Sequence, residues 1–213
     1  MRILCAALLI VLSAVSAAWA SIDLPVPKKE GGIGIYDAFN MRSSASGGSF
    51  PSMKLNNEEL SQILWAASGY NRDGKKWTVP MARGLKPYCK IYVAIDSGVF
   101  LYDWENNKLI EVSKNDIRSK IVNQEFAKTA PCSLIFVTDI EVLKGAYPDK
   151  ELAHHFTSVA AGAMTQNVYL AATALRLGTR YLYGINRAII HEELNLSKDD
   201  SAICIMIIGK YAL

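Results

Sequence analysis

The chain has 213 residues, a hydrophobic content of 51% and a formal net charge of +3. A chain of this length suits a single domain with a sizeable core. Its basic residues form no long run, so the sequence does not indicate nucleic-acid binding. Its cysteines and histidines lack the spacing of metal ligands, and no zinc site is expected.

The first twenty residues have the pattern of a secretory signal peptide. Arg2 provides a basic start, a long apolar run follows it, and small residues lead up to Ala20. We therefore expect a signal peptide over residues 1–20, with cleavage after Ala20. Residues 21–213 would then form an exported domain, periplasmic or secreted, without a stable membrane span. An uncleaved anchor helix is the alternative.

The segment that follows is polar and rich in Gly, Ser and Pro. Its prolines bias the preceding residues away from helix, so its beginning should be extended. A short helix is expected over residues 35–41, and a loop over residues 42–48. In this loop Arg42 precedes hydroxyl residues and glycines, which together have the charge and the donors to bind an anion. A solvated loop has the same composition.

The middle of the chain alternates helix and strand signals. Asn56 or Asn57 is expected to cap a helix that ends at Gly69. Two strands joined by an Asp-Ser-Gly turn, and a third strand after them, predict an antiparallel meander over residues 89–112. The further expected elements are a helix over 113–128, a strand over 133–138, a loop or short helix over 140–151, a short helix over 186–194 and a strand over 202–208.

The stretch from Thr157 to Gly184 predicts a central core helix followed by a short strand. Thr157 or Ser158 is expected to cap the helix, and Gly178 to end it in the left-handed conformation. Apolar residues occur on every side, so we expect the helix to be buried all round. The polar residues 165–167 in its middle argue against a membrane span.

Hairpins and helices without regular βαβ alternation predict the α+β class. Three cysteines follow the expected signal peptide, Cys89, Cys132 and Cys204, and each lies in an apolar segment typical of a strand. Buried free thiols fit this setting, and one disulfide with a leftover thiol is the alternative in an oxidising compartment.

Five segments occur in an order that matches a known family. Residues 162–178 fit the helix pattern G-x-x-x-QN-x-x-L-x-A-x-x-L-G-L-G, with Arg176 in place of one glycine. Residues 60–72 fit L-x-x-L-L-W-A-x-x-G-x-x-R, and the meander and the strand over 133–138 follow in order. Residues 80–87 keep the two prolines of the loop P-S-x-x-N-x-Q-P. The chain thus resembles the nitroreductase family of flavin (FMN) oxidoreductases.

Two further motifs of the family have partial matches. In its phosphate-binding motif R-R-S-x-R, the residues Arg42 and Ser43 match, whereas Met41 and Ala45 stand where the family has arginines. The ending V-G-[YKR] is similar to the sequence Ile-Gly-Lys that closes at Lys210.

The resemblance implies an α+β sheet, antiparallel or mixed, that helices sandwich around a central buried helix. It also implies a homodimer with FMN at the dimer interface. No side chain is expected to be catalytic, because the flavin carries the chemistry. The cofactor-binding residues that the resemblance implies are Arg42, Ser43, Ser44, Met81, Ala82, Gly84, Lys86 and Lys210.

The expected function is that of an exported FMN-dependent oxidoreductase. The family passes a hydride through the flavin N5 to a small organic acceptor in ping-pong order, with NAD(P)H as a possible donor. Lys86, if it faces the N1/O2 edge of the flavin, would stabilise the reduced anionic ring. Gln166 and Asn167 either contact ligand or form packing hydrogen bonds. The alternative is a non-enzymatic binding protein that keeps the fold and has lost FMN, as the altered residues Met41, Ala45, Met81 and Gly84 suggest.

Overall fold

A computed structural model describes residues 20–72, 74 and 76–212, so the expected signal peptide up to residue 19 lies outside the described residues. Its main sheet has seven strands in the order β1-β6-β5-β4-β7-β9-β8, and all their pairings are antiparallel. These strands are β1 (Ser21–Asp23), β4 (Cys89–Ile95), β5 (Gly98–Asp103), β6 (Lys108–Ser113), β7 (Cys132–Thr138), β8 (Leu177–Leu182) and β9 (Ala202–Lys210). A separate hairpin consists of β2 (Tyr70–Asn71) and β3 (Lys76–Trp77).

The helices are α1 (Ile35–Met41), α2 (Asn57–Ser68), α3 (Ile140–Lys144), α4 (Lys150–Ala174) and α5 (Arg187–Glu193). Short 3-10 turns cover Gly47–Ser49, Ala82–Gly84 and Glu125–Ala127. This combination confirms the α+β class, the expected meander of β4, β5 and β6, and the short helices before and after the core. None of the helices in the described residues is long and apolar enough to cross a membrane.

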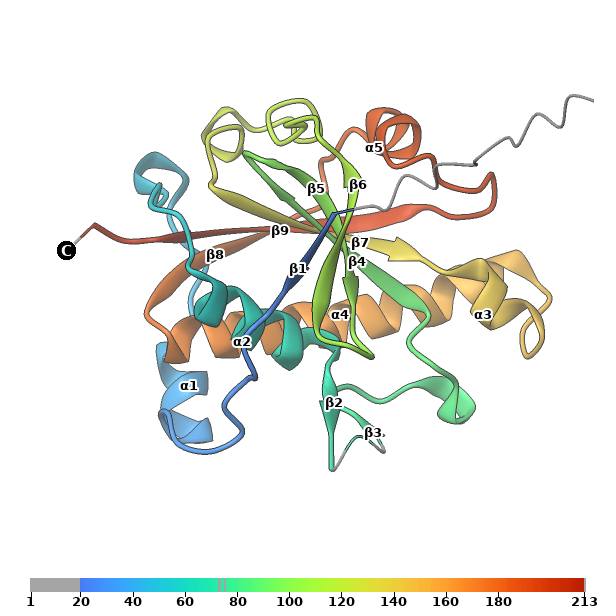
Figure 1. The fold of residues 1–213 in the computed structure, drawn as a ribbon, viewed down its shortest axis with the longest axis horizontal. Coiled ribbons are helices and arrows are strands. Elements are labelled where there is room, and N and C mark those ends of the chain that lie inside the picture. The colour runs from blue at the N-terminus through green and yellow to red at the C-terminus, as the bar shows by residue number, and fades with distance from the viewer. Residues whose placement is uncertain (1–19, 73, 75, 213) are drawn as a thin grey trace, which may run out of the picture.

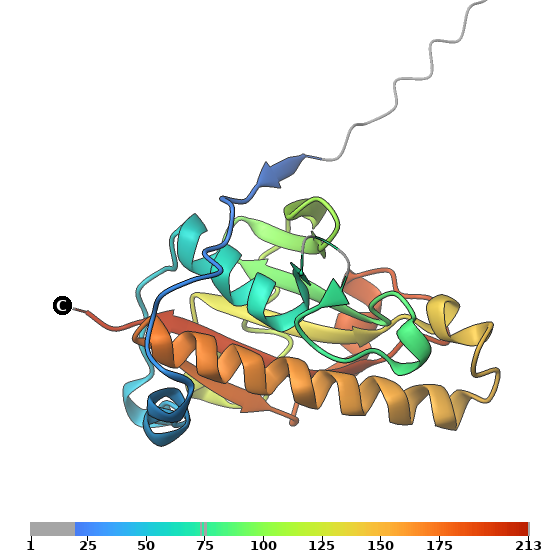
Figure 2. The ribbon, with the colours of Figure 1, turned by 90° about the horizontal axis from the view of Figure 1, so that it is seen from below.

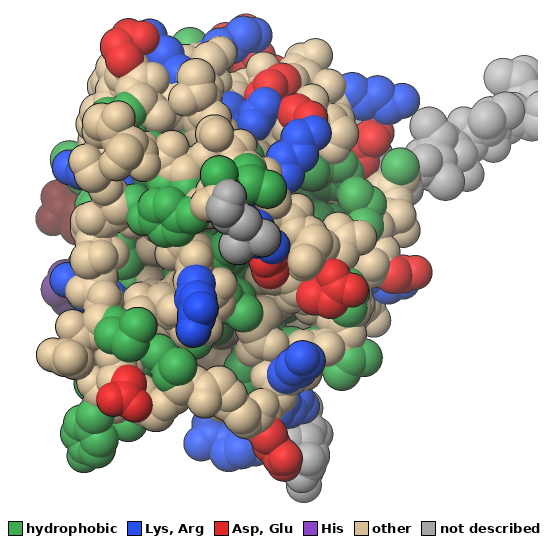
Figure 3. Space-filling model, turned by 90° about the vertical axis from the view of Figure 1, so that its left-hand side faces the viewer, with side chains coloured by type: hydrophobic (Ala, Val, Ile, Leu, Met, Phe, Trp, Pro, Cys, Tyr) green, Lys and Arg blue, Asp and Glu red, His purple; other side chains and the backbone are tan. Residues whose placement is uncertain are grey.

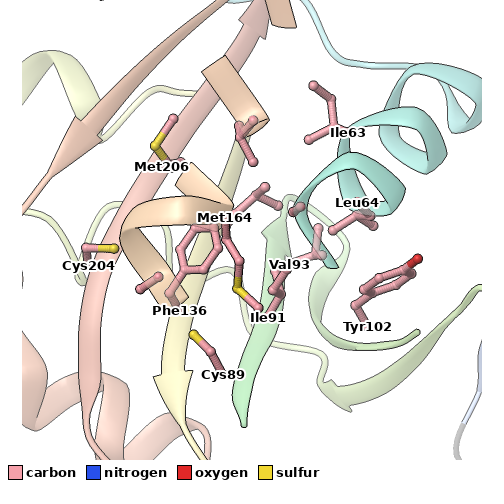
Figure 4. Close-up of a cluster of buried hydrophobic side chains, with 14 of the residues drawn as sticks. Ile63, Leu64, Cys89, Ile91, Val93, Tyr102, Phe136, Met164, Cys204 and Met206 are labelled. Atoms are coloured by element: carbon pink, nitrogen blue, oxygen red, sulfur yellow. The ribbon is translucent and has the colours of Figure 1, made fainter. Parts of the chain in front are cut away.

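The sheet is covered on both faces. Helices α2 and α4 pack on one face, and α5 with the chain between β6 and β7 covers the other (Figure 1). Alternation along β7 produces these two layers, because Leu134 and Phe136 belong to one core while Ile135 and Val137 belong to the other. Figure 4 shows Phe136 beside Met164 of α4 in the first of these cores.

Helix α2 forms where the local signals predict it. The Asn56 side chain accepts the backbone N–H of Glu59 at 2.8 Å, and the Glu59 carboxylate accepts the backbone N–H of Asn56 at 2.9 Å. This capping box satisfies two N–H groups that the first turn leaves without helical partners. Gly69 follows the last helical residue, as expected.

The expected bounds of the central helix were wrong at both ends. Helix α4 begins at Lys150, where the Asp149 side chain accepts the N–H of Leu152 at 2.8 Å and caps it. Thr157 lies inside the helix and donates its hydroxyl to the Ala153 carbonyl. Gly178 lies in β8, and the left-handed residue after the helix is Arg176, with φ of 56°.

The prediction that this helix is buried all round was also wrong. Figure 2 shows α4 along the outside of the molecule, with the sheet and α2 behind it. Val159 is 59% exposed and Leu152 is 43% exposed, whereas Met164 and Val168 are fully buried. The apolar residues of α4 therefore lie on two different surfaces. One packs against the sheet, and the other is exposed to solvent.

The helix expected over 113–128 does not form. Strand β6 continues to Ser113, and turns follow it, with only a 3-10 turn at Glu125–Ala127. Ile117 and Ile121 are fully buried against the second face of the sheet. Arg118 donates to the carbonyl of Pro131 at 3.1 Å. The local helical pattern is overridden because these side chains are buried and because Arg118 is hydrogen-bonded to a residue distant in the sequence.

The three cysteines of the described chain are buried free thiols, as one of the two expectations stated. Cys89 and Cys204 lie on β4 and β9, which are separated by β7, so a disulfide between them is out of reach. Burial raises the pKa of the Cys132 thiol to about 12. The thiols therefore stay neutral near neutral pH and pack as small apolar groups.

Gly209 is required by a close backbone approach. A Cβ at this position would lie 1.9 Å from the Pro51 carbonyl oxygen, and neither backbone can move without breaking β9 from its neighbours. Gly145, at the end of α3, has φ of −70° and no atom within 4 Å of an added Cβ. Gly145 therefore provides the matched control for a substitution at Gly209.

We expect Gly209→Ala to lower the free energy of unfolding by about 3 kcal/mol or more, because the clash is with backbone. Gly145→Ala should change it by less than about 0.5 kcal/mol. Urea unfolding followed by circular dichroism measures both. Equal stability of the two variants would contradict the close approach of residues 51 and 209.

Candidate functional site

Two cavities are lined in part by expected site residues. The first, of about 240 Å³, opens at the C-terminal end of α4. Its lining consists of Met41, Ser43, Ala45, Thr173, Arg176, Leu177, Gly178, Thr179 and Tyr211. Figure 3 shows this end of the molecule, where hydrophobic side chains surround isolated Lys and Arg side chains.

Arg42 and Ser44 meet at the ring of Tyr169, which extends from α4. The Arg42 guanidinium carbon lies 5.2 Å from the centroid of the ring. The Tyr169 hydroxyl is 2.9 Å from the Ser44 hydroxyl and accepts the backbone N–H of Tyr181 at 2.9 Å. One phenol thus holds the end of α1 against the edge strand β8.

Backbone contacts complete this attachment. The Ala45 N–H donates to the Thr179 carbonyl at 2.9 Å, and the Arg180 guanidinium donates to the Ala45 carbonyl at 3.1 Å. Edge strands leave N–H and C=O groups open on one side, and here the segment that contains Arg42 covers part of that side. The loop predicted over 42–48 is therefore held in place by the sheet.

The second cavity, of about 500 Å³, lies next to the β2–β3 hairpin. Its lining consists of Asn71, Arg72, Lys76, Trp77, Thr78, Val79, Pro80, Met81 and Gly84. Arg72 and Arg83 have φ of 45° and 53°, so both hold the left-handed conformation that non-glycine residues rarely adopt. The loop is anchored where the Tyr88 hydroxyl accepts the N–H of Ala82 at 3.1 Å. Burial raises the pKa of that hydroxyl, which keeps it neutral.

Asn167 connects α4 to this second side. Its side-chain amide donates to the Ala66 carbonyl of α2 at 2.9 Å, and its amide nitrogen lies 3.5 Å from the Thr78 carbonyl. Asn167 therefore forms packing hydrogen bonds, one of the two roles that its sequence context allows. Gln166, the neighbouring residue, is exposed.

Both predicted lysines form ion pairs with carboxylates. Lys86 lies 3.2 Å from Glu105, and its side chain is 69% exposed. Lys210 lies 2.7 Å from Glu59, whose carboxylate also caps α2. Neither lysine lines the two cavities described above.

The eight predicted residues thus form two groups and two outliers. Ser43 lines the first cavity, and its neighbours Arg42 and Ser44 contact Tyr169 instead. Met81 and Gly84 line the second cavity, and Ala82 lies between them in sequence. On a helix with 3.6 residues per turn, Tyr169 and Asn167 point about 200° apart, so the two groups lie on opposite flanks of α4. The exposed stripe that contains Val159 runs between these flanks.

The sequence alone did not predict Tyr169, Thr173 and Tyr211, because no motif distinguishes them from ordinary core or surface residues. Arg176 stood out only because it replaces a glycine of the family's helix pattern. Among the described residues, neither cavity has an Asp or Glu in its lining. Cations and hydroxyls without carboxylates are the donor set that suits a phosphate group, so the first cavity fits the phosphate end of a flavin mononucleotide.

Comparison with known proteins agrees with this arrangement. The family model described as "Nitroreductase family" matches residues 49–210. A curated protein of Methanocaldococcus jannaschii, named a putative nitroreductase, is 31% identical over 138 residues, which cover 60% of this chain and 68% of that protein. The chain therefore belongs to the nitroreductase family.

Solved structures show the same fold. A crystal structure from Ralstonia eutropha JMP134, titled a putative nitroreductase, superposes with a TM-score of 0.82 at 31% identity, covering 94% of this chain and 93% of that chain. The NADPH:FMN oxidoreductase of Vibrio harveyi, complexed with NAD+, superposes with a TM-score of 0.56 at 19% identity, covering 84% and 69%. The α+β nitroreductase fold expected from sequence is thus confirmed.

The Tyr169 hydroxyl offers a direct test of how the segment at Ser44 is held against β8. We expect Tyr169→Phe to lower the free energy of unfolding by about 1 kcal/mol, because two hydrogen bonds are lost. Amide exchange at Tyr181 should become faster, since its N–H loses its acceptor. Tyr183→Phe is the matched control, because Tyr183 is 65% exposed and its contact with Arg187 uses the ring. Unchanged exchange at Tyr181 would contradict the contact.

Proposed function

We propose that this protein is an exported oxidoreductase that uses FMN as its cofactor. The observation that carries the proposal is the cavity at the C-terminal end of α4, whose described lining has arginine and hydroxyl side chains and no Asp or Glu. A dianionic phosphate is stabilised by such donors and would be repelled by carboxylates. Membership of the nitroreductase family supports the same cofactor.

The residues of the chain have separate roles in this proposal. Arg42 supplies charge to the phosphate from its position over Tyr169, and Ser43 and Ser44 supply hydroxyl donors. Tyr169 positions this segment through its hydrogen bonds. The bound flavin supplies the transfer of hydride or electrons to a small organic acceptor, and this chain needs no nucleophilic side chain for that chemistry.

The loop around Met81 is proposed to contact the flavin ring. Met81 and Gly84 line the second cavity, and Met81 offers an apolar surface to a flat ring. Gly84 has φ of 66° and open space beside it, so backbone can approach a ligand there. The N–H of Ala82 donates to the Tyr88 hydroxyl, and this hydrogen bond holds the loop in place.

A homodimer completes the proposed site. The predicted residues lie on both flanks of the exposed stripe of α4, so a second copy packed on that stripe contacts both groups. Exposed apolar side chains continue from α4 onto α1, where Tyr36 is 85% exposed and Phe39 is 54% exposed. Apolar surface of this kind, spread over two adjoining helices, is typical of an interface.

The electron donor follows less directly from the residues. The name of the Vibrio harveyi relative supports NAD(P)H as the donor and FMN as the cofactor. Export, with a signal peptide over residues 1–20 and a domain over 21–213, would place the protein where NAD(P)H is scarce. In that compartment a different reductant, or outward electron transfer, would replace it.

One observation favours a second candidate function, a binding protein of the same fold without FMN. Lys86 and Lys210 are paired with Glu105 and Glu59, and neither lysine lines the two cavities. Met41 and Ala45 bring no charge to the first cavity. The number of cations at the phosphate position therefore decides between the two candidates.

The deciding experiment is an absorbance spectrum of the purified protein, before and after incubation with FMN. We expect the visible bands of a bound flavin, and release of FMN on denaturation. A folded, colourless protein that takes up no FMN at tens of micromolar would overturn the proposal and favour the binding protein.

The dimer has its own test. Val159→Glu places a charge in the exposed stripe, so we expect the dimer dissociation constant to rise about a hundredfold or more and bound FMN to be lost with the dimer. Val26→Glu is the matched control, because Val26 is 88% exposed and lines a shallow cavity to which α4 contributes no described residue. Sedimentation and flavin content measure both. A Val159→Glu protein that remains a dimer with FMN bound would contradict this interface.

A further inference from the structure

Arg176 occupies an unusual backbone position at the first cavity. It follows the last turn of α4 and adopts φ of 56°, a region that favours glycine. Side chains other than glycine, asparagine and aspartate are disfavoured there, and strained residues of this kind cluster at ligand sites. Arg176 also belongs to the lining of the first cavity.

Among the described residues that line this cavity, Arg176 is the only charged one. No carboxylate of the described chain lies within ion-pair distance of its guanidinium or of that of Arg42. The hydroxyl of Tyr211 lies near the same wall, 3.0 Å from where a Cβ on Gly178 would stand. The cavity thus has a positive and hydrogen-bonding end.

Electrostatics favours more than one cation at this cavity. The C-terminal end of a helix carries a partial negative charge, and the cavity lies at that end of α4. An anion placed there is repelled by the last carbonyl groups unless nearby cations outweigh them. Without Arg176, Arg42 would have to offset both the charge of a phosphate dianion and the partial negative charge at the end of the helix.

The other basic residues near the proposed flavin do not line the first cavity. Lys210 binds Glu59, and Lys86 binds Glu105. Arg83 lies 5.9 Å from the ring centroid of Tyr147, on the side of the second cavity. Arg176 is the cation that remains at the first cavity.

We propose that Arg176 binds the phosphate group of the ligand in this cavity, together with Arg42. The inference rests on the proposed use of FMN. It makes Arg176 a second cation for the phosphate, in a cavity to which Met41 and Ala45 bring no charge. A purely structural role is the competing explanation, since an arginine at the end of a helix also offsets the helix dipole.

Three variants separate these roles. Arg176→Gly removes the charge and relieves the backbone, Arg176→Asn removes the charge and tolerates the same φ, and Arg176→Lys keeps the charge. Equilibrium titration with FMN and with riboflavin measures how much the phosphate group contributes. Thermal unfolding of each variant without ligand measures stability.

We expect Arg176→Gly and Arg176→Asn to weaken FMN binding about tenfold to a hundredfold, and to change riboflavin binding by less than about threefold. Arg176→Lys should retain most of the preference for FMN. A role limited to offsetting the helix dipole predicts instead a lower melting temperature for Arg176→Asn without ligand, and equal losses of FMN and riboflavin affinity. An unchanged ratio of FMN to riboflavin affinity in the uncharged variants would overturn the inference.

A titration with inorganic pyrophosphate keeps the two proposals distinguishable. If the wild-type protein binds neither flavin, the proposed function fails, and pyrophosphate then tests Arg176 alone. Stabilisation by pyrophosphate in the wild type that disappears in Arg176→Asn would support the anion site. No stabilisation of the wild type by pyrophosphate would overturn it.

Discussion

Helix α4 can bury only part of its circumference against the sheet, and this constraint places every other feature of the site. Met164 and Val168 face the core, while Val159 stays exposed. Tyr169 and Asn167 lie on opposite flanks of the exposed stripe, and each is fixed by hydrogen bonds to a different layer of the molecule. The helix therefore acts as the common support for two cavities that do not share a lining residue. A second copy on the stripe would contact both.

Charge pairing divides the basic residues of the site into two kinds. Lys86 and Lys210 sit within 3.2 Å and 2.7 Å of carboxylates, so their charges are already offset. Arg42 instead stacks on an aromatic ring, which holds the guanidinium without neutralising it. An arginine over a ring keeps its fork of N–H donors for a ligand. A lysine in an ion pair would first have to release its partner, so pairing reduces the number of cations that an anionic ligand meets.

The edge strand β8 explains why distant segments meet at the first cavity. Its free side would be open to water and to other chains, and the segment around Ala45 and Ser44 covers part of it instead. This cover brings the end of α1 to the end of α4. The same arrangement puts Gly178 in the strand and leaves Arg176 to make the turn from helix to strand.

Local signals in the sequence determined the elements whose partners are close along the chain. Asn56 and Glu59 specify the start of α2 within a single turn, and the turn between β4 and β5 specifies a hairpin. The order of the family motifs also predicted the α+β fold. The residues around Ile117 were misread as a helix because burial against the far face of the sheet outweighs a helical pattern. Likewise, no local rule pairs Arg42 with Tyr169. Both outcomes depend on contacts between residues far apart in sequence, which only the packed tertiary structure brings together.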